Sequence, residues 1–137
     1  MLLGGSCHCR NITFKLDWPA ESAEIPARAC TCTFWPRHGG VWTACASAAL
    51  EIHVRNWALV SRYAFETRTA DFHVCSRCGA VPLVTSRIAD RLYAVVNVHA
   101  LDNLAASMLR PAPATFDAES EQDRLARRAR AWIANVT

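Results

Sequence analysis

The segment Cys75-Ser76-Arg77-Cys78-Gly79 decides how this chain is held together. A Cys-x-x-Cys-Gly sequence is typical of a zinc knuckle, because its two thiolates converge on one point and the intervening amides can donate to the sulfurs. The glycine that follows can take the left-handed backbone conformation that closes such a turn. The segment therefore predicts half of a tetrahedral four-sulfur metal site.

The other half is expected from a different cysteine pattern, Cys7-His8-Cys9. On a strand, residues i and i+2 share a face, so both thiolates can point at one metal ion. A second pair of the same form, Cys30-Thr31-Cys32, competes for this role, and Cys45 is left over. Three cysteine pairs allow three ways of forming one four-sulfur site, so spacing alone leaves the pairing open.

The seven cysteines could instead form a disulfide framework. The N-terminal residues Met1-Leu2-Leu3-Gly4-Gly5 lack the positive region and apolar stretch of a signal peptide, which argues against an oxidising compartment. An odd number of cysteines also suits a reduced, metal-binding protein better than a secreted one. We therefore expect a cytoplasmic protein that binds zinc (Zn) through at least one cysteine quartet.

Length and charge narrow the function classes. A chain of 137 residues is close to the usual size of one domain, so we expect a single domain over residues 1–137. No apolar run approaches the roughly 20 residues needed to cross a bilayer, so no membrane association is expected. The formal net charge is only +3, and the arginines of residues 124–130 are balanced by the acidic residues of 117–123. We interpret this segment as a solvated helix face and expect no nucleic-acid partner.

The central part of the chain is predicted to be strand-rich. Residues 11–16 alternate with a period of two, as in a half-buried strand. Pro82 indicates that its strand lies at a sheet edge or carries a bulge, whereas Pro19 and Pro26 are expected to bracket a loop. The other predicted strands are residues 41–45, 50–54, 59–63, 70–74, 81–85 and 92–98.

The last twenty residues change to a helical period. Leu125, Ala129, Trp132, Ile133 and Val136 fall on one stripe, and acidic residues lead while arginines follow, an order that suits the helix dipole. We predict a helix over roughly residues 118–135 that packs this stripe on the sheet, with docking to a partner protein as the alternative. The expected fold class is mostly β, with two sheets clamped near the zinc and one C-terminal α-helix.

Five short motifs occur in an order that is typical of one protein family. They are Gly5-Ser6-Cys7-His8-Cys9-Arg10-Asn11-Ile12-Thr13-Phe14, Ala29-Cys30-Thr31-Cys32, Arg37-His38-Gly39-Gly40, Phe72-His73-Val74-Cys75-Ser76-Arg77-Cys78-Gly79 and Val96-Asn97-Val98-His99-Ala100-Leu101-Asp102. Together they cover about residues 4–103, and through them the chain resembles the glutathione-dependent formaldehyde-activating enzymes, a family that also includes centromere protein V.

The resemblance implies a fold, a metal site and a reaction. The family fold is a mostly antiparallel β assembly called a β-tent, and its structural zinc here corresponds to Cys7, Cys9, Cys75 and Cys78. The family reaction joins formaldehyde to glutathione, giving S-hydroxymethylglutathione, and belongs to the carbon–sulfur lyases. The implied partners are therefore a small-molecule thiol such as glutathione and an aldehyde.

The resemblance also implies a second metal site, from which this chain departs. The family pattern there is Cys-x-Cys-x-x-Cys, which gives three thiolates and an open fourth position, as a catalytic zinc requires. Cys30 and Cys32 match, but the third position is Trp35, whose indole nitrogen can only donate. We expect an incomplete site, unless His38 or Cys45 replaces the thiolate. A strained disulfide between Cys30 and Cys32 is a further alternative.

Two functions of different classes follow from this departure. In the first, the protein is a lyase in which His38 moves a proton, and Arg10 and Arg37 attract the glutathione carboxylates. In the second, it is a zinc-stabilised binding module without turnover, which has lost a catalytic ligand but kept the structural quartet. The number of zinc ions per chain separates the two.

Overall fold

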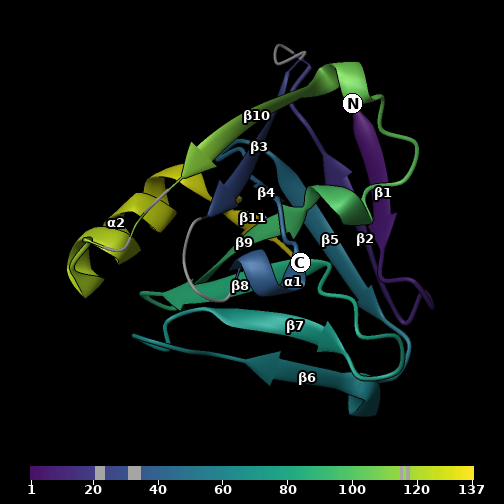
Figure 1. The fold of residues 1–137 in the computed structure, drawn as a ribbon, viewed down its shortest axis with the longest axis horizontal. Coiled ribbons are helices and arrows are strands. Elements are labelled where there is room, and N and C mark those ends of the chain that lie inside the picture. The colour runs from purple at the N-terminus through teal and green to yellow at the C-terminus, as the bar shows by residue number, and fades with distance from the viewer. Residues whose placement is uncertain (21–23, 31–34, 115, 117) are drawn as a thin grey trace.

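The chain folds into two β-sheets with a helix beside them. The computed structural model describes residues 1–20, 24–30, 35–114, 116 and 118–137. Within these ranges the two sheets meet at an angle, and helix α2 (Glu121–Ala131) lies against the larger one (Figure 1). The prediction of a mostly β fold with two sheets and a C-terminal helix is confirmed.

The smaller sheet carries the N-terminal hairpin. Its described strands are β1 (Leu2–Ser6), β2 (Ile12–Asp17), β5 (Ala49–Val54) and β11 (Asn135–Val136), in the order β1-β2-β5-β11. β1, β2 and β5 pair antiparallel, whereas β11 runs parallel to β5. The period-two pattern of β2 buries Ile12, Phe14 and Leu16 on one face, as the sequence predicts.

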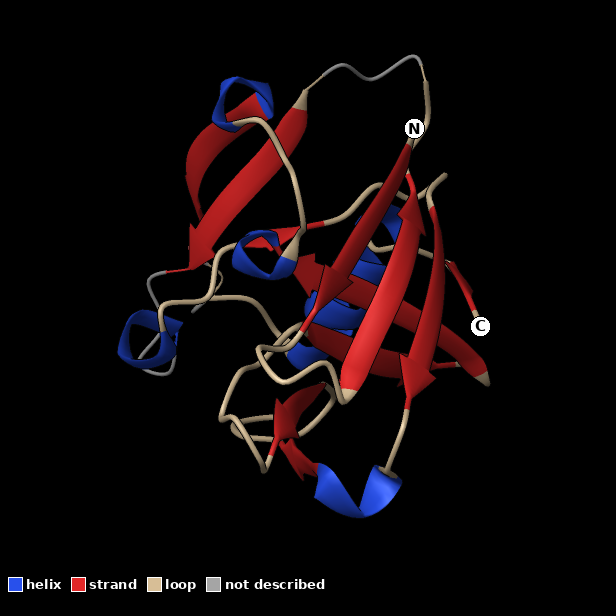
Figure 2. Ribbon diagram, turned by 90° about the vertical axis from the view of Figure 1, so that its right-hand side faces the viewer, coloured by secondary structure: helices blue, strands red, loops and turns tan. Residues whose placement is uncertain are grey.

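The larger sheet contains seven strands among the described residues. They are β3 (Ile25–Cys30), β4 (Trp42–Thr43), β6 (Val60–Tyr63), β7 (Asp71–Cys75), β8 (Leu83–Ile88), β9 (Arg91–Asn97) and β10 (Leu109–Ala114). Their order is β10-β3-β4-β9-β8-β7-β6, and each pair is antiparallel except β10 with β3. Figure 2 shows the smaller sheet lying across the strands of the larger one.

One apolar core fills the space that these elements enclose. It takes alternate side chains from both sheets and the residues that follow α2. Its largest fully buried members include Trp18, Leu50, Leu83, Val96 and Ile133. Because the smaller sheet, the larger sheet and the C-terminal segment all contribute, the cysteine-containing turns at the strand ends lie against a packed core.

Helix α2 is shorter than predicted. Its cap is Ser120, whose side chain accepts a hydrogen bond from the Asp123 amide at 3.1 Å, and it ends at Ala131 rather than near residue 135. Ile133 exchanges two backbone hydrogen bonds with Ala94 of β9, both 3.0 Å long, so the chain leaves the helix to join strands. Trp132 packs into the core as predicted and is 7% exposed, but the helical stripe does not continue to Val136.

Strand β1, which contains Gly4 and Gly5, was not among the predicted strands, and prolines account for three further differences. Pro26 lies within β3 rather than in a loop, and residues 109–114, part of which look linker-like, form the parallel edge strand β10. Pro82 precedes β8, which is an interior strand, so the prediction of an edge strand there is wrong. The Pro82 carbonyl accepts the Asn97 amide at 2.8 Å, and a proline just outside the strand removes no ladder donor.

The remaining helical segments are short. They are α1 (Trp35–His38) and the 3₁₀ turns η1 (Trp57–Leu59), η2 (Val98–Ala100) and η3 (Ala106–Met108). None of the described helices has the length and apolar character needed to span a bilayer.

Candidate metal centre

The first cysteine pair lies in a turn and not on a strand. Cys7 and Cys9 follow β1 in the connection to β2. The Arg10 amide donates to the Cys7 carbonyl at 3.2 Å, and Arg10 has a left-handed φ of 66°. The prediction of a strand for this pair is therefore wrong, because the turn rather than the β alternation brings the two thiols together.

Three hydrogen bonds, one buried and two partly buried, hold this turn in place. The Ile12 amide donates to the Cys7 sulfur at 3.3 Å. The side chain of Asn11, which is 5% exposed, donates to the Asn56 carbonyl at 3.1 Å and accepts the Asn56 amide at 3.0 Å. A structural role for Asn11 was not predicted from the sequence. Its position just after the two cysteines was the feature that could have indicated this role.

The second cysteine pair forms the predicted knuckle at the end of β7. The Gly79 amide donates to the Cys75 carbonyl at 2.7 Å, and the Cys75 amide donates to the Ala80 carbonyl at 3.0 Å. Gly79 has a φ of 79°, in the left-handed region that L residues with a side chain avoid. The chain therefore reverses tightly enough for Cys75 and Cys78 to face the same point.

The two turns bring four sulfurs together. The ligand atoms of Cys7, Cys9, Cys75 and Cys78, called the cysteine quartet below, all lie within 4.8 Å of one another. The Cys7–Cys9 and Cys9–Cys75 sulfur distances are 3.8 and 3.5 Å. Sulfurs placed about 2.3 Å from the centre of a tetrahedron are about 3.8 Å apart. The quartet is therefore preorganised at the spacing of a tetrahedral thiolate site and could hold a metal ion.

The pKa values of the two knuckle thiols are shifted in opposite directions. Burial raises the pKa of Cys75 to about 11, although amide hydrogen bonds from Cys78 and Arg77 act in the other direction. At Cys78 burial also acts to raise the pKa, but hydrogen bonds from the Ala80 and Cys9 amides outweigh it and the pKa falls to about 6. One buried thiol thus faces one ready thiolate, and a cation would favour ionisation of both.

The quartet joins the two sheets. Cys7 and Cys9 come from the β1–β2 connection of the smaller sheet, whereas Cys75 and Cys78 come from β7 and its turn in the larger one. Cys7 and Cys75 are 1% and 0% exposed and belong to the apolar core. A bound metal would therefore act as a cross-link between the sheets, in agreement with the prediction that the sheets are clamped at this point.

The turn glycine offers a test of the knuckle geometry. Gly79→Ala forces a side chain into a left-handed conformation, so we expect the metal-loaded protein to lose about 1–2 kcal/mol of unfolding free energy. Gly4→Ala is the matched control, because a Cβ there meets only the Asp102 carboxylate at an ordinary 3.6 Å. Urea unfolding of both variants measures the difference, and equal losses would contradict the assigned turn.

The remaining cysteine pair, Cys30 and Cys32, lies mostly outside the described residues. Cys30 is the last residue of β3, and Cys32 falls within residues 31–34, which are not described; nor are the side chains of Cys30 and Trp35. The C-terminal ends of β3 and β7 lie on opposite sides of α1 in Figure 1. Cys45 is not in the quartet, and its sulfur lies 3.3 Å from the Ser47 hydroxyl. An incomplete second site at Trp35 thus stays a prediction.

His38 is the candidate catalytic residue that the structure does describe. It ends α1 and is half-buried, and its ring centroid lies 5.8 Å from that of Trp42 and 5.9 Å from that of Phe72. Burial lowers the pKa of His38 below its ordinary value, so the imidazole is neutral at pH 7. A Cβ at Gly40 would come within 2.5 Å of the His38 ring, which explains why a glycine lies beside it.

The two arginines considered for substrate binding differ in their surroundings. Arg10 forms an ion pair with Asp102 at 3.7 Å, which connects the first cysteine turn to the segment after η2. Arg37 is exposed on α1.

A role for Asn97 was also not predicted from the sequence. Its side chain accepts hydrogen bonds from the His99 and Val41 amides at 3.1 and 3.5 Å and donates to the Val81 carbonyl at 3.1 Å.

Comparison with known proteins points to one family. A sequence profile described as glutathione-dependent formaldehyde-activating enzyme matches residues 2–119, a range that contains the whole quartet and ends before α2. Among solved structures, the chain is similar to a protein of Rhodobacter sphaeroides, with 26% sequence identity and a TM-score of 0.54. That similarity covers 76% of this chain and 92% of the other. No curated protein matches the chain.

Proposed function

The chain belongs to the glutathione-dependent formaldehyde-activating enzyme family, and from that premise we propose that it is a zinc-binding carbon–sulfur lyase with an impaired second metal site. The observation that carries the proposal is the quartet itself, four sulfurs at tetrahedral spacing. A family member that keeps this site keeps the structural metal that stabilises the fold around the reacting groups.

Zinc is the proposed metal of the quartet. Tetrahedral sites of four thiolates hold zinc or iron–sulfur centres. A Cys-x-x-Cys-Gly knuckle facing a short turn with two further cysteines is typical of structural zinc sites, which are closed to solvent and carry no redox chemistry. The burial of Cys7 and Cys75 in the core fits a metal that stabilises the fold rather than one that binds substrate.

The proposed reaction joins a small-molecule thiol such as glutathione to an aldehyde such as formaldehyde. The sulfur lone pair attacks the carbonyl carbon, a carbon–sulfur bond forms, the carbonyl π bond breaks, and the thiol proton ends on the oxygen. A metal held by Cys30 and Cys32 would supply a thiolate at neutral pH. Neutral His38 accepts the thiol proton and returns it to the oxygen. Arg37 is the exposed cation available to a glutathione carboxylate, because Arg10 is paired with Asp102.

A non-catalytic, zinc-stabilised binding module is the second candidate function. The feature that favours it is Trp35, which replaces the third thiolate of the family pattern. With two thiolates, the second site falls short of the three protein ligands of a catalytic zinc. Such a protein would keep the quartet and the fold, and would lose turnover.

Metal analysis and an activity assay test these proposals. We expect inductively coupled plasma mass spectrometry to find one zinc per chain in protein purified without chelators. We expect slow formation of S-hydroxymethylglutathione, observed by NMR above the uncatalysed background. His38→Gln should lower this rate about a hundredfold, whereas His53→Gln, an exposed histidine on β5, should leave it unchanged. A chain without zinc would contradict the metal proposal, and one zinc without any activity would favour the binding module.

We also propose a cytoplasmic location. The structure describes the side chains of five of the seven cysteines, and all five are free thiols, namely Cys7, Cys9, Cys45, Cys75 and Cys78. Free thiols in a metal-binding arrangement suit a reducing compartment, where glutathione is also abundant.

A further inference from the structure

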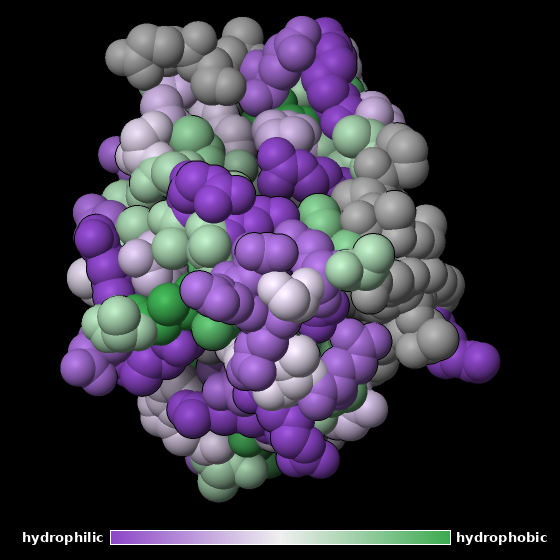
Figure 3. All heavy atoms as spheres, turned by 90° about the vertical axis from the view of Figure 1, so that its left-hand side faces the viewer, coloured by the Kyte–Doolittle hydropathy of each residue, from purple (hydrophilic) through white to green (hydrophobic). Residues whose placement is uncertain are grey.

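A pocket opens between α2 and the larger sheet. Strands β4, β7, β8 and β9 contribute apolar side chains to it, among them Trp42, Phe72, Val84 and Val95. The rest of the lining comes mainly from the segment before β7 and from α2, with Arg28 of β3 and Phe116. Figure 3 views the molecule from the side of α2 and shows hydrophilic side chains across this face with apolar atoms between them. Because α2 begins at residue 121, this wall lies beyond the range that the family profile matches.

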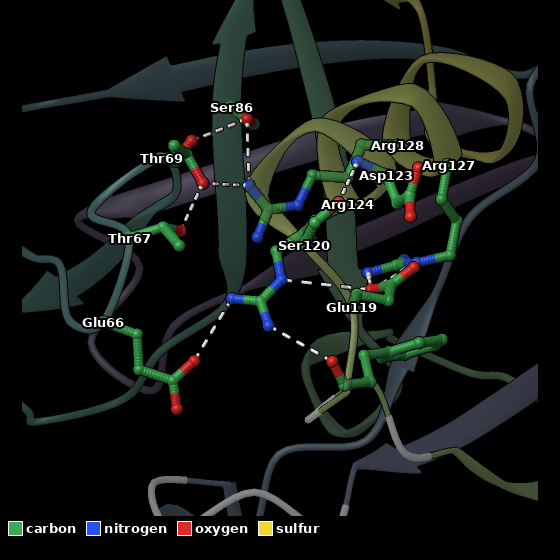
Figure 4. Close-up of polar contacts among 11 residues, drawn as sticks. Glu66, Thr67, Thr69, Ser86, Glu119, Ser120, Asp123, Arg124, Arg127 and Arg128 are labelled. Atoms are coloured by element: carbon green, nitrogen blue, oxygen red, sulfur yellow. Dashed lines mark hydrogen bonds and ion pairs between the residues drawn. The ribbon is translucent and has the colours of Figure 1, made fainter.

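Arg128 of α2 carries a buried charge into this pocket. The residue is 8% exposed and lines the pocket. One terminal nitrogen, Nη1, donates to the hydroxyls of Thr69 and Ser86 at 2.8 and 3.3 Å, and the guanidinium carbon lies 5.0 Å from the centre of the Trp132 ring. Its Nε is buried and has no hydrogen-bond partner among the described residues. Figure 4 shows the other terminal nitrogen of Arg128 with no contact drawn to it.

The charges of Arg124 and Arg127, two other arginines of α2, are compensated by carboxylates. Arg124 lies 3.1 Å from a Glu66 oxygen and 3.9 Å from Glu119, and Arg127 makes a two-pronged contact with Glu119 at 2.9 to 3.2 Å (Figure 4). No carboxylate of the described chain lies within ion-pair distance of Arg128. Isolated buried charges are strongly disfavoured unless something compensates them, and the described part of the chain supplies Arg128 with no carboxylate partner.

A second arginine, which forms no ion pair with the described residues, lines the same pocket. Arg28 of β3 is half-buried and lies opposite Trp42 of β4 in the register. None of the ion pairs between described residues includes Arg28. The acidic residue in the pocket lining is Glu66, which is already paired with Arg124. The pocket thus combines an apolar wall with two guanidinium groups that form no ion pair with the described residues.

We propose that this pocket binds a small organic anion, a carboxylate carried by a flat apolar body. The planar fork of a guanidinium matches a carboxylate, and the pairing is stronger where water is excluded. Trp42, Phe72 and Trp132 line the pocket, so part of its wall is aromatic, which suits a flat apolar ligand. The pocket contains none of the quartet cysteines, but two of its lining residues, Trp42 and Phe72, also contact the ring of His38.

Calorimetric titration with three probes tests the proposal. Phenylacetate supplies both the carboxylate and the apolar body, phenylacetamide supplies the body without the charge, and inorganic phosphate supplies the charge without the body. We expect phenylacetate to bind at least about tenfold more tightly than either of the others. Equal affinity for the acid and the amide, or tighter binding of phosphate, would overturn the proposal, as would no phenylacetate binding at about 10 mM.

Two matched arginine variants of α2 test whether Arg128 supplies the positive charge that binds the carboxylate. Arg128→Gln should weaken phenylacetate binding at least about tenfold and leave phenylacetamide binding unchanged, whereas Arg130→Gln, an exposed arginine outside the pocket, should change neither. If both variants lose affinity equally, the assignment fails. Thermal unfolding monitors the fold, and if Arg128→Gln does not fold, Arg28→Gln decides: unchanged phenylacetate affinity in that variant would contradict the site.

Discussion

Cys78→Ser is expected to leave the protein without its structural metal and largely unfolded. A serine hydroxyl does not ionise at neutral pH, so the quartet would fall to three thiolates around a centre built for four. The free energy of binding structural zinc is folding free energy, about 10–16 kcal/mol in zinc-finger peptides, and whole domains are stable by only about 5–15 kcal/mol. Losing even half of the metal's contribution would remove most of the stability.

The position of the quartet between the two sheets makes the expected effect large. Cys7 and Cys75 are buried in the core, and without the metal their sulfurs would face one another without a cation. Circular dichroism and zinc analysis of Cys78→Ser measure the loss. The control is Cys45→Ser, which removes a thiol outside the quartet and should retain both zinc and fold. If Cys78→Ser keeps a cooperative unfolding transition near that of the control, the quartet is not a structural site.

The strands that the sequence predicts are those with a clear side-chain period. In β2, Ile12, Phe14 and Leu16 alternate with polar residues, and this pattern alone places one face in the core. Two of the strands that were missed, β3 and β10, lack such a pattern. β3 contains Pro26, and β10 contains two prolines within its six residues; both follow tertiary pairing rather than local preference. Parallel pairing between distant segments leaves no local signal.

The C-terminal segment shows how a tertiary contact overrides a helical period. The spacing of Trp132, Ile133 and Val136 fits one helical stripe, but these side chains can also be buried from an extended chain. Ile133 pairs with Ala94, and Val136 lies in β11 beside β5. These backbone hydrogen bonds to distant strands favour an extended chain, and helix propensity carries no information about them.

The metal centre was more predictable than its local conformation. Cys75, Cys78 and Gly79 carry a turn signature that includes the left-handed residue, and the structure contains that turn. Cys7 and Cys9 were correctly expected to converge, but through a strand, whereas they lie in a turn held by Asn11. A buried asparagine in a turn has no pattern of its own, because its partner, Asn56, lies far along the chain.

Trp35→Cys is expected to complete the second metal site. The family pattern requires a thiolate at this position, three residues after Cys32, and tryptophan offers no metal ligand. With a third thiolate the site has the ligand set of a catalytic zinc, three protein donors and an exchangeable fourth position. We expect the zinc content to rise from one to two per chain, and the rate of S-hydroxymethylglutathione formation to rise by about two orders of magnitude or more.

Trp57→Cys is the control that separates a completed site from an added thiol. It makes the same substitution at an exposed tryptophan in η1, so it adds a cysteine without adding a ligand beside Cys30 and Cys32. Mass spectrometry under native conditions counts the zinc ions in both variants and in the parent chain. Two zinc ions in the parent would contradict the prediction and direct attention to His38 or Cys45 as the third ligand. One zinc in Trp35→Cys would show that this segment does not bind metal in this chain, and the binding-module function would then be favoured, because the quartet alone would remain to stabilise the fold.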